Sequence, residues 1–179
     1  MPETALDFES YYDSEYSISK MGYYAYTHDP RFRVTAVAFA DPATPGTASA
    51  YIDDNLTQVP WKGRLSDRVA IAHNATFDRH VFERLQELGN IPQGIKPAEW
   101  LCTAAMCRYL QVPGSLAEAA EAVLGIVVDK TARTKAKGDT RKQGDLFDAL
   151  SSYAQKDADT CARLWAAGGK FWPENERRL

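Results

Sequence analysis

The amino-acid sequence predicts an α/β fold. Short runs of apolar and β-branched residues alternate along the chain with segments whose apolar residues recur at helical spacing, as in a sheet flanked by helices. The length of 179 residues suits one domain with a sizeable core, so we expect a single domain over residues 1–179. The composition, with 45% hydrophobic and 25% charged residues, is that of a globular protein.

The first third of the chain predicts several strands. Residues 4–8 form a short apolar run that enters the core, and residues 32–40 form a longer β-rich run. Residues 21–26 are also β-rich and precede a turn signal at 28–30, while residues 47–52 predict another strand. We therefore expect an antiparallel meander after the opening strand.

The rest of the chain predicts strands and helices in alternation. The expected elements are a strand at 69–73, a helix at 77–88, a strand at 100–103 that leads into a helix ending near 110, a helix at 115–125, and a last helix at 146–167. Gly89 and Gly125 follow helical patterns, and glycine readily adopts the left-handed conformation that ends a helix. Ser115 and Glu118 have the spacing of a capping box at the start of their helix.

Asp7 and Glu9 lie two residues apart on the opening strand. Side chains alternate between faces along a strand, so both carboxylates project from one face and their neighbours Leu6 and Phe8 from the other. Two like charges that project together are unfavourable unless a cation lies between them. Taken alone, the pair is equally well explained by a solvated strand end.

Asp157 occupies the apolar stripe of the last helix. The stripe consists of Leu150, Tyr153, Asp157, Cys161 and Leu164. An ionised carboxylate on a core-facing stripe is costly unless it is paired or bound to a metal ion, and an ion pair with arginine or lysine is the competing explanation. Tyr153 lies one turn earlier on the same face, whereas Asp159 lies off the stripe, where it can be solvated.

Asp78 follows the strand at 69–73 and lies near the start of the next helix. An acid there is often a helix cap, and Asn74 in the preceding loop brings an amide to the same strand end. Each feature is ordinary by itself. Together, four carboxylates from three separated segments fit two divalent ions about 3.5–4 Å apart that flank a scissile phosphate. Mg²⁺ and Mn²⁺ prefer such oxygen ligands.

Three motifs, in order, resemble those of the DEDD superfamily of 3′–5′ exonucleases. Asp-Phe-Glu at 7–9 is similar to the first motif (DxE), Asn-Ala-Thr-Phe-Asp at 74–78 resembles the second (NxxFD), and Tyr-Ala-Gln-Lys-Asp at 153–157 matches the third in its tyrosine form (YxxxD). The histidine branch has a histidine five residues before the last aspartate. This chain has Ser152 there, so the tyrosine branch (DEDDy) is indicated.

The resemblance implies a ribonuclease H-like fold, that is, a mixed five-stranded β-sheet flanked by α-helices. It also implies phosphodiester hydrolysis with two divalent ions, Mg²⁺ or Mn²⁺. Asp7, Glu9 and Asp157 would hold one ion, Asp7 would share the second, Asp78 would act largely through water, and Tyr153 would orient the attacking water. The implied catalytic residues are Asp7, Glu9, Asp78, Tyr153 and Asp157, of which the four acids are the metal ligands. The implied substrate contacts are Phe8, Ser10, Asn74, Phe77 and Tyr153, with Asn74 against the terminal nucleotide.

Within the superfamily the chain is most similar to the proofreading exonuclease domains of phage-type family A DNA polymerases, through segments such as 22–26, 113–116 and 173–177. This favours DNA as the substrate, at single-stranded or frayed 3′ ends, and a separate DNA polymerase as a partner. A stand-alone nuclease, one half of a split enzyme and an excised domain all fit. Two further hypotheses stay open: a non-catalytic module that binds nucleic acid or a polymerase, and an exonuclease that trims RNA.

Two positions depart from the family pattern. Cys102 precedes Thr103 where such proteins often have an aspartate, and Asp13 stands where bacterial relatives use an apolar residue against the terminal bases. Tyr11 or Tyr12 can replace that residue, because an aromatic ring stacks on any base, and both are equally well explained as surface tyrosines.

Cysteine and histidine content, targeting signals and charge indicate which cofactors and which cellular location to expect. Three cysteines without a CxxC pair and three histidines support neither a disulfide framework nor a zinc site. No secretory signal or membrane span is evident, so we expect a cytoplasmic protein, in a host cytoplasm if it is phage-encoded. The net charge is −3, yet residues 130–142 hold six basic residues and one acid. In that segment Lys130, Arg133, Lys135 and Lys137 either grip a nucleic-acid backbone or form a solvated loop.

Overall fold

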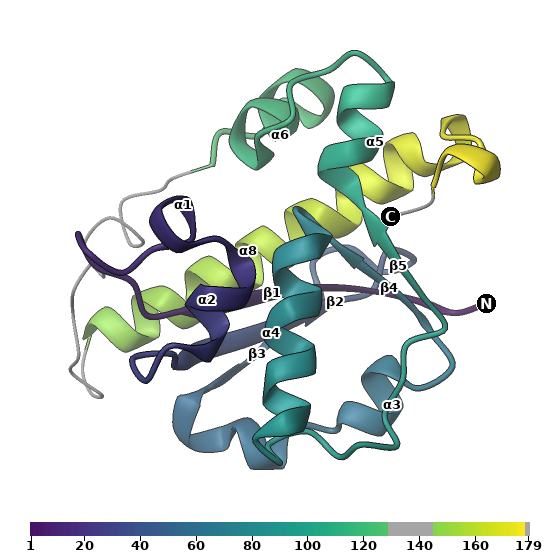
Figure 1. The fold of residues 1–179 in the computed structure, drawn as a ribbon. Coiled ribbons are helices and arrows are strands. Elements are labelled where there is room, and N and C mark those ends of the chain that lie inside the picture. Colours follow the sequence, from purple (N-terminus) through teal and green to yellow (C-terminus); the bar gives the residue numbers. More distant parts are fainter. Residues whose placement is uncertain (129–144, 178–179) are drawn as a thin grey trace.

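Five strands form one mixed sheet with helices on both faces (Figure 1). The structure is a computed structural model that describes residues 1–128 and 145–177, with the side chains of 53–55 and 145–148 left aside. The expected mixed five-stranded sheet flanked by helices, as in a ribonuclease H-like fold, is therefore confirmed. The basic segment at 130–142, for which we expected either nucleic-acid binding or a solvated loop, lies outside the described residues.

The sheet has the strand order β3-β2-β1-β4-β5. The strands are β1 (Glu3–Ser10), β2 (Val34–Ala40), β3 (Ser49–Ile52), β4 (Val69–Ala72) and β5 (Glu99–Cys102). The central strand β1 pairs antiparallel with β2 and parallel with β4, and β4 pairs parallel with β5. Since β1 and β4 run in the same direction, their carboxyl ends open at the same edge of the sheet. The segments that follow these two ends are close to each other in space.

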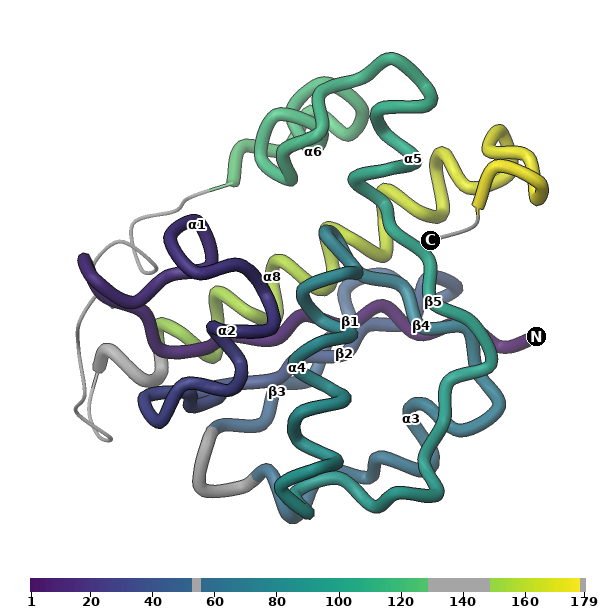
Figure 2. The backbone as a smooth tube through the Cα atoms, viewed as in Figure 1, coloured from purple at the N-terminus to yellow at the C-terminus, as the bar shows by residue number. Residues whose placement is uncertain are grey.

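The two faces of β1 carry different cores. Leu6 and Phe8 pack with Val81 and Phe82 of α4 (Ala75–Glu87), whereas Ala5 packs with residues of α8 (Asp145–Gly168). Figure 2 shows α4 in front of the sheet and α8 behind it. The alternation predicted for the opening strand is thus confirmed, because Leu6 and Phe8 face α4.

Five more helices lie in the part of the chain that the structure describes. They are α1 (Ile18–Met21), α2 (Tyr23–His28), α3 (Trp61–Leu65), α5 (Thr103–Tyr109) and α6 (Leu116–Leu124), with 3-10 turns at Asp53–Gln58, Gly169–Phe171 and Glu174–Glu176. Ser115 precedes α6 and Gly125 ends it with a φ of 67°, as expected. The Ser115 hydroxyl does not cap the helix as a capping box requires; it donates to the Glu118 carboxylate instead.

The strand predicted at 21–26 is wrong, because this segment folds as two short helices separated by Gly22. Gly22 has a φ of 75°, which breaks any extended run. The aromatic residues that suggested a strand serve a local cluster instead: the Tyr26 ring stacks on Tyr16 with a centroid distance of 4.4 Å, and the Tyr16 hydroxyl donates to the Tyr26 carbonyl. The antiparallel part of the sheet therefore has one strand fewer than expected, and β2 pairs directly with β1.

Alanines form the contact between α8 and the sheet. Ala154, Ala158 and Ala162 recur every four residues on α8, and they pack in one core with Ala36 and Ala38 of β2. All five are essentially excluded from solvent. Small side chains on both sides allow the helix backbone to approach the strands closely, which brings other α8 side chains within reach of β1.

We predict that Ala38→Leu lowers the free energy of unfolding by about 1–3 kcal/mol, because extra methylenes have no space between β2 and α8. Urea denaturation measures the change. The matched control is Ala122→Leu on the exposed side of α6, which should alter stability far less. Equal stability of the two variants would show that the alanine contact is not tightly packed.

His73 joins the end of β4 to two later segments. Its Nε2 lies 3.0 Å from the Gly114 carbonyl oxygen and its Nδ1 lies 2.9 Å from the Thr103 hydroxyl. Burial, the main cause, lowers the pKa of His73 to about 4 from its ordinary value of 6.5. The folded protein therefore holds the neutral imidazole at pH values where the unfolded chain binds a proton.

The sign of the resulting pH dependence follows from linkage. The stability contributed by neutral His73 is complete above about pH 6.5 and declines as the pH falls towards 4, by about 2–3 kcal/mol in all. We predict that His73→Gln, which keeps a donor for Gly114, removes this part of the decline. Urea denaturation of both proteins at pH 7 and pH 5 measures the decline in stability. A variant with the same decline as the wild type would show that His73 does not cause it.

Candidate active site

Three acids from two elements meet beside the central strand. Asp7 and Glu9 of β1 and Asp157 of α8 each offer a carboxylate oxygen, and these oxygens all lie within 4.8 Å of one another. Glu9 and Asp157 are buried, and Asp7 is partly buried. Residues that are 150 positions apart in the chain thus form one acidic cluster.

The fold explains why these three side chains meet. Asp7 and Glu9 alternate with Leu6 and Phe8, so they project towards α8, and the alanine contact described above holds that helix close to β1. The ladder between β1 and β2 shifts its register between Glu9 and Ser10, so regular pairing ends immediately after the second acid. A backbone irregularity at that point often accompanies a functional site.

The donor set of the cluster fits a hard divalent cation. Three carboxylates within 4.8 Å repel one another, and burial removes the water that would screen them. Oxygen-only donors are the ligands preferred by Mg²⁺ and Mn²⁺, and neither histidine nor cysteine belongs to the cluster. The cluster can therefore hold a metal ion of this class.

Asp78 lies next to the cluster, at the edge of β1 beyond its pairing with β4. It is 2% exposed, and its Oδ1 accepts a hydrogen bond of 3.1 Å from the backbone N–H of Phe8. The pairing of β1 with β4 ends at Ala5, so the first turn of α4 covers this part of β1 in place of a strand. The pKa of Asp78 is raised to about 8, mainly by burial and also by the nearby negative charge of Glu9, while the hydrogen bond from the Phe8 N–H acts to lower it. A cation at the cluster would also lower it.

The stripe predicted for the last helix is buried throughout, as expected. Tyr153 lies one turn before Asp157 on the same face of α8, and both side chains are buried. Asp159 lies off the stripe, as expected, and is partly exposed. It accepts hydrogen bonds from Arg163 at 2.7 Å and from the backbone N–H of Gly46 at 2.5 Å. Asp159 therefore ties α8 to the loop before β3.

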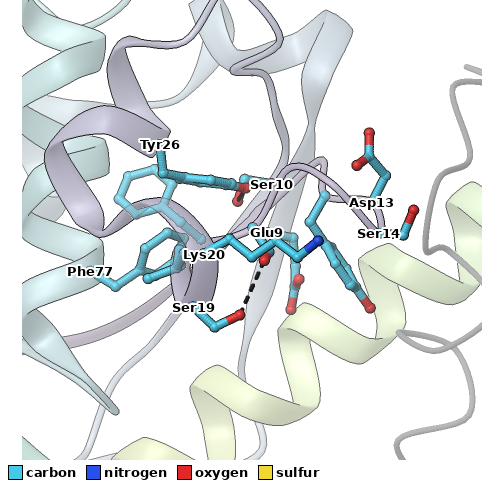
Figure 3. A pocket seen from close by; sticks show the side chains of 12 residues that line it. Glu9, Ser10, Asp13, Ser14, Ser19, Lys20, Tyr26 and Phe77 are labelled. Atoms are coloured by element: carbon cyan, nitrogen blue, oxygen red, sulfur yellow. Dashed lines mark hydrogen bonds between the residues drawn. The ribbon is translucent and has the colours of Figure 1, made fainter.

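A pocket of about 470 Å³ opens beside Glu9. Figure 3 shows Phe77 and Tyr26 on one side of it, Asp13 and Ser14 on the other, and Glu9 between them. Its walls combine aromatic rings with hydroxyl groups and one lysine; they include Phe8, Ser10, Tyr12, Ser17, Ser19 and Lys20.

The expected substrate contacts divide into two groups. Phe8, Ser10 and Phe77 line the pocket, and the Ser10 hydroxyl is bonded to the Tyr26 hydroxyl at 2.7 Å. Asn74 and Tyr153 are not among its lining residues. Asn74 is exposed at the start of α4, whereas Tyr153 is buried beside the acidic cluster.

Asp13 supports the loop that forms one wall of the pocket. It accepts hydrogen bonds from the backbone N–H groups of Glu15 and Tyr16, each at 2.7 Å, and from the Tyr11 hydroxyl at 2.9 Å. These bonds, led by that from Glu15, lower the pKa of Asp13. The aspartate at position 13, where bacterial relatives have an apolar residue, is thus explained by its support of this loop. Of the two tyrosines expected to replace an apolar residue, Tyr12 lines the pocket.

Several lining residues were missed by the sequence reasoning. Ile18, Ser19 and Lys20 belong to α1, and Tyr26 belongs to α2, in the region assigned to a strand. Two signals could have identified this short helix: Ser17 at its start and Gly22 at its end.

Comparisons with known proteins identify relatives of this chain. The family model DNA_pol_A_exo1, described as 3′–5′ exonuclease, matches residues 13–168. This match includes Asp78 and Asp157 and begins after Glu9. The DNA polymerase of Bacillus phage SP02 is 30% identical over 125 residues, which cover 69% of this chain and 18% of the polymerase. The chain thus corresponds to less than a fifth of that relative.

Solved structures share the fold at low sequence identity. The catalytic core of RRP6 from Trypanosoma brucei has a TM-score of 0.59 and 17% identity, covering 92% of this chain and 39% of that one. A nuclease in its apo form has a TM-score of 0.57 and 16% identity, covering 95% of this chain and 74% of that one. Among the described residues, no helix has the length and apolar character needed to cross a membrane.

We predict that Mn²⁺ binds the protein and that Asp157→Asn weakens this binding by at least about tenfold, since one charged donor is lost. Isothermal titration calorimetry measures it. Asp159→Asn is the matched control, because Asp159 lies two positions away on α8 and is bonded to Arg163 instead. Equal Mn²⁺ affinity of the two variants would exclude the acidic cluster as the binding site.

Proposed function

The chain belongs to the 3′–5′ exonuclease family DNA_pol_A_exo1, and we propose that it hydrolyses phosphodiester bonds at the 3′ end of DNA and releases nucleoside monophosphates. The reaction depends on two divalent metal ions, Mg²⁺ or Mn²⁺. One observation carries the proposal: Asp7, Glu9 and Asp157 present their carboxylate oxygens within 4.8 Å of one another. In a family of nucleases, such a cluster next to a pocket is the natural position for the scissile phosphate.

Each residue of the cluster has a proposed role. Asp7, Glu9 and Asp157 hold one ion, Asp7 shares the second, and Asp78 acts on the second through water. When bound, the ions make a nucleophile from water and stabilise the leaving oxygen. The hydrogen bond from the Phe8 N–H to Oδ1 fixes the orientation of the Asp78 carboxylate near Glu9.

Tyr153 is proposed to orient the attacking water, which assigns the chain to the tyrosine branch (DEDDy). Two observations support the role: Tyr153 is buried on the same face of α8 as Asp157, and it lies one turn away. At the position of the histidine in the other branch the chain has Ser152, which is exposed. The hydroxyl of Tyr153 is then the protein group that holds the water in line with the phosphate.

The substrate is proposed to be a single-stranded or frayed 3′ end. Phe8, Ser10 and Phe77 line the pocket beside Glu9, and Asn74 at the start of α4 contacts the terminal nucleotide. A pocket of about 470 Å³ is of a size that suits one unstacked nucleotide. An end that is paired must therefore fray before its last phosphate reaches the acids.

DNA is favoured over RNA by the similarity to the DNA polymerase of Bacillus phage SP02. By the same similarity, a separate DNA polymerase is the proposed protein partner, proofreading the proposed role, and the cytoplasm the proposed location. A single nuclease domain spanning residues 1–179 remains our proposal for the domain organisation. RNA trimming is the second candidate, because the fold is shared with the catalytic core of RRP6.

We predict that the protein shortens a 5′-labelled single-stranded DNA oligonucleotide stepwise with Mg²⁺ or Mn²⁺ and leaves it intact with a chelator. Asp7→Asn and Asp157→Asn should each abolish the ladder while the thermal unfolding transition remains cooperative. Asp159→Asn, the control on α8, should still degrade the oligonucleotide.

Three outcomes separate the alternatives. A wild-type protein that binds the oligonucleotide without shortening it would be the non-catalytic module. Faster degradation of a matched RNA strand would show that the protein trims RNA rather than DNA. Persistent cleavage by both Asp7→Asn and Asp157→Asn would mean that the reaction takes place elsewhere.

A further inference from the structure

The amide of Asn74 is not used to cap the helix that it precedes. Asn74 is the residue before α4 and has a left-handed backbone, with φ of 85° and ψ of 50°. At this position an asparagine usually accepts a hydrogen bond from a backbone N–H of the first turn, but here no side-chain bond caps the helix. The side chain is exposed. The Asn74 side chain therefore does not stabilise α4 as an N-cap.

A tyrosine from another helix holds this amide. The hydroxyl of Tyr23, in α2, donates a hydrogen bond of 3.2 Å to Oδ1 of Asn74. The Tyr23 ring in turn stacks on the imidazole of His80 in α4, with a centroid distance of 5.5 Å and an interplanar angle of 15°. The stack fixes the position of the ring, and the ring fixes the position of the hydroxyl.

The bond determines which atoms Asn74 presents to a ligand. An amide is planar, so engagement of Oδ1 by Tyr23 directs the Nδ2 group to the opposite side. Among the residues that the structure describes, no hydrogen bond from Nδ2 to an acceptor is formed. Asn74 thus presents the Nδ2 donors, while one acceptor position of its Oδ1 is taken by Tyr23. Phosphate, sugar and base oxygens of a nucleotide are acceptors, which matches this polarity.

We propose that Tyr23 is a positioning residue that holds the Asn74 amide so that Nδ2 donates to the terminal nucleotide. This inference rests on the proposed function, in which Asn74 contacts that nucleotide. Asn74 lies four residues before Asp78, so the donor is about 6 Å along α4 from the buried acid. The contact binds the nucleotide equally well before and during the reaction, so its loss appears in KM rather than in kcat.

The test compares steady-state cleavage of a 5′-labelled single-stranded DNA oligonucleotide by four variants. Tyr23→Phe keeps the stack on His80 and removes the hydroxyl, so KM should rise about 3- to 10-fold, the value of one net hydrogen bond, with kcat close to wild type. Asn74→Ala should raise KM at least as much. The double variant should be no worse than Asn74→Ala alone, because Tyr23 acts only through Asn74.

Tyr24→Phe is the matched control. Tyr24 neighbours Tyr23 in the same helix, is 69% exposed, and stacks on His28 rather than on His80. Its loss of a hydroxyl should leave KM unchanged. Thermal unfolding of all variants distinguishes positioning from stability, since Tyr23→Phe should unfold within a few degrees of wild type.

A second variant separates positioning from folding. Asn74→Asp can still accept from the Tyr23 hydroxyl and adds a negative charge at the N-terminus of α4, which favours the helix. It has no donor for the nucleotide. We expect an unfolding temperature equal to or above that of wild type together with a KM at least as high as that of Asn74→Ala.

The outcomes are distinguishable. A KM of Tyr23→Phe equal to that of wild type, or effects of the two single changes that multiply in the double variant, would overturn the role of Tyr23 and leave the exonuclease assignment intact. Absence of cleavage by the wild-type protein with Mg²⁺ and with Mn²⁺ would instead reject the proposed function, and this inference with it.

Discussion

The mutual repulsion of Asp7, Glu9 and Asp157 is the constraint on which the arrangement of the site depends. Two of these side chains are buried, and all three bring oxygens within 4.8 Å of one another. Folding must supply the energy that holds like charges together, and it does so through the apolar contact of α8 with the sheet. A divalent cation would turn this unfavourable charge density into a binding site. The alanine contact therefore holds α8 against the sheet and keeps Asp157 next to the acids of β1.

The central strand connects the acidic cluster to the other side of the sheet. Its side chains alternate between α8 and α4, and its backbone N–H at Phe8 bonds to Asp78. The first turn of α4 thereby contacts the strand between the two acids Asp7 and Glu9. Asn74, at the start of the same helix, is held by Tyr23 of α2. The helix α4 consequently links the position of the acidic cluster to that of the proposed nucleotide contact.

Much of the fold and of the acidic cluster could be predicted from the sequence, because the elements that form them have strong local patterns of apolar and polar residues. The alternation at 4–8 predicts which face of the strand carries the acids, and the stripe through Asp157 predicts which face of the last helix is buried. The acids meet once this helix packs on the sheet. The segment at 21–26 was misassigned because its tyrosines have high strand propensity, whereas a tertiary stack of Tyr26 on Tyr16 decides its structure. The pairing of Asp159 with Arg163 and Gly46, and the support that Asp13 gives to its loop, depend on contacts that no periodicity reveals.

The central claim is that a divalent cation occupies the space between these acids, and anomalous diffraction from crystals grown with Mn²⁺ tests it most directly. We expect an anomalous peak in contact with oxygens of Asp7, Glu9 and Asp157, at metal–oxygen distances of about 2.0–2.2 Å, as hard cations require. Crystals of Asp157→Asn should lack that peak or have it strongly reduced. A wild-type crystal in which the Mn²⁺ peaks lie only at other positions would contradict the account.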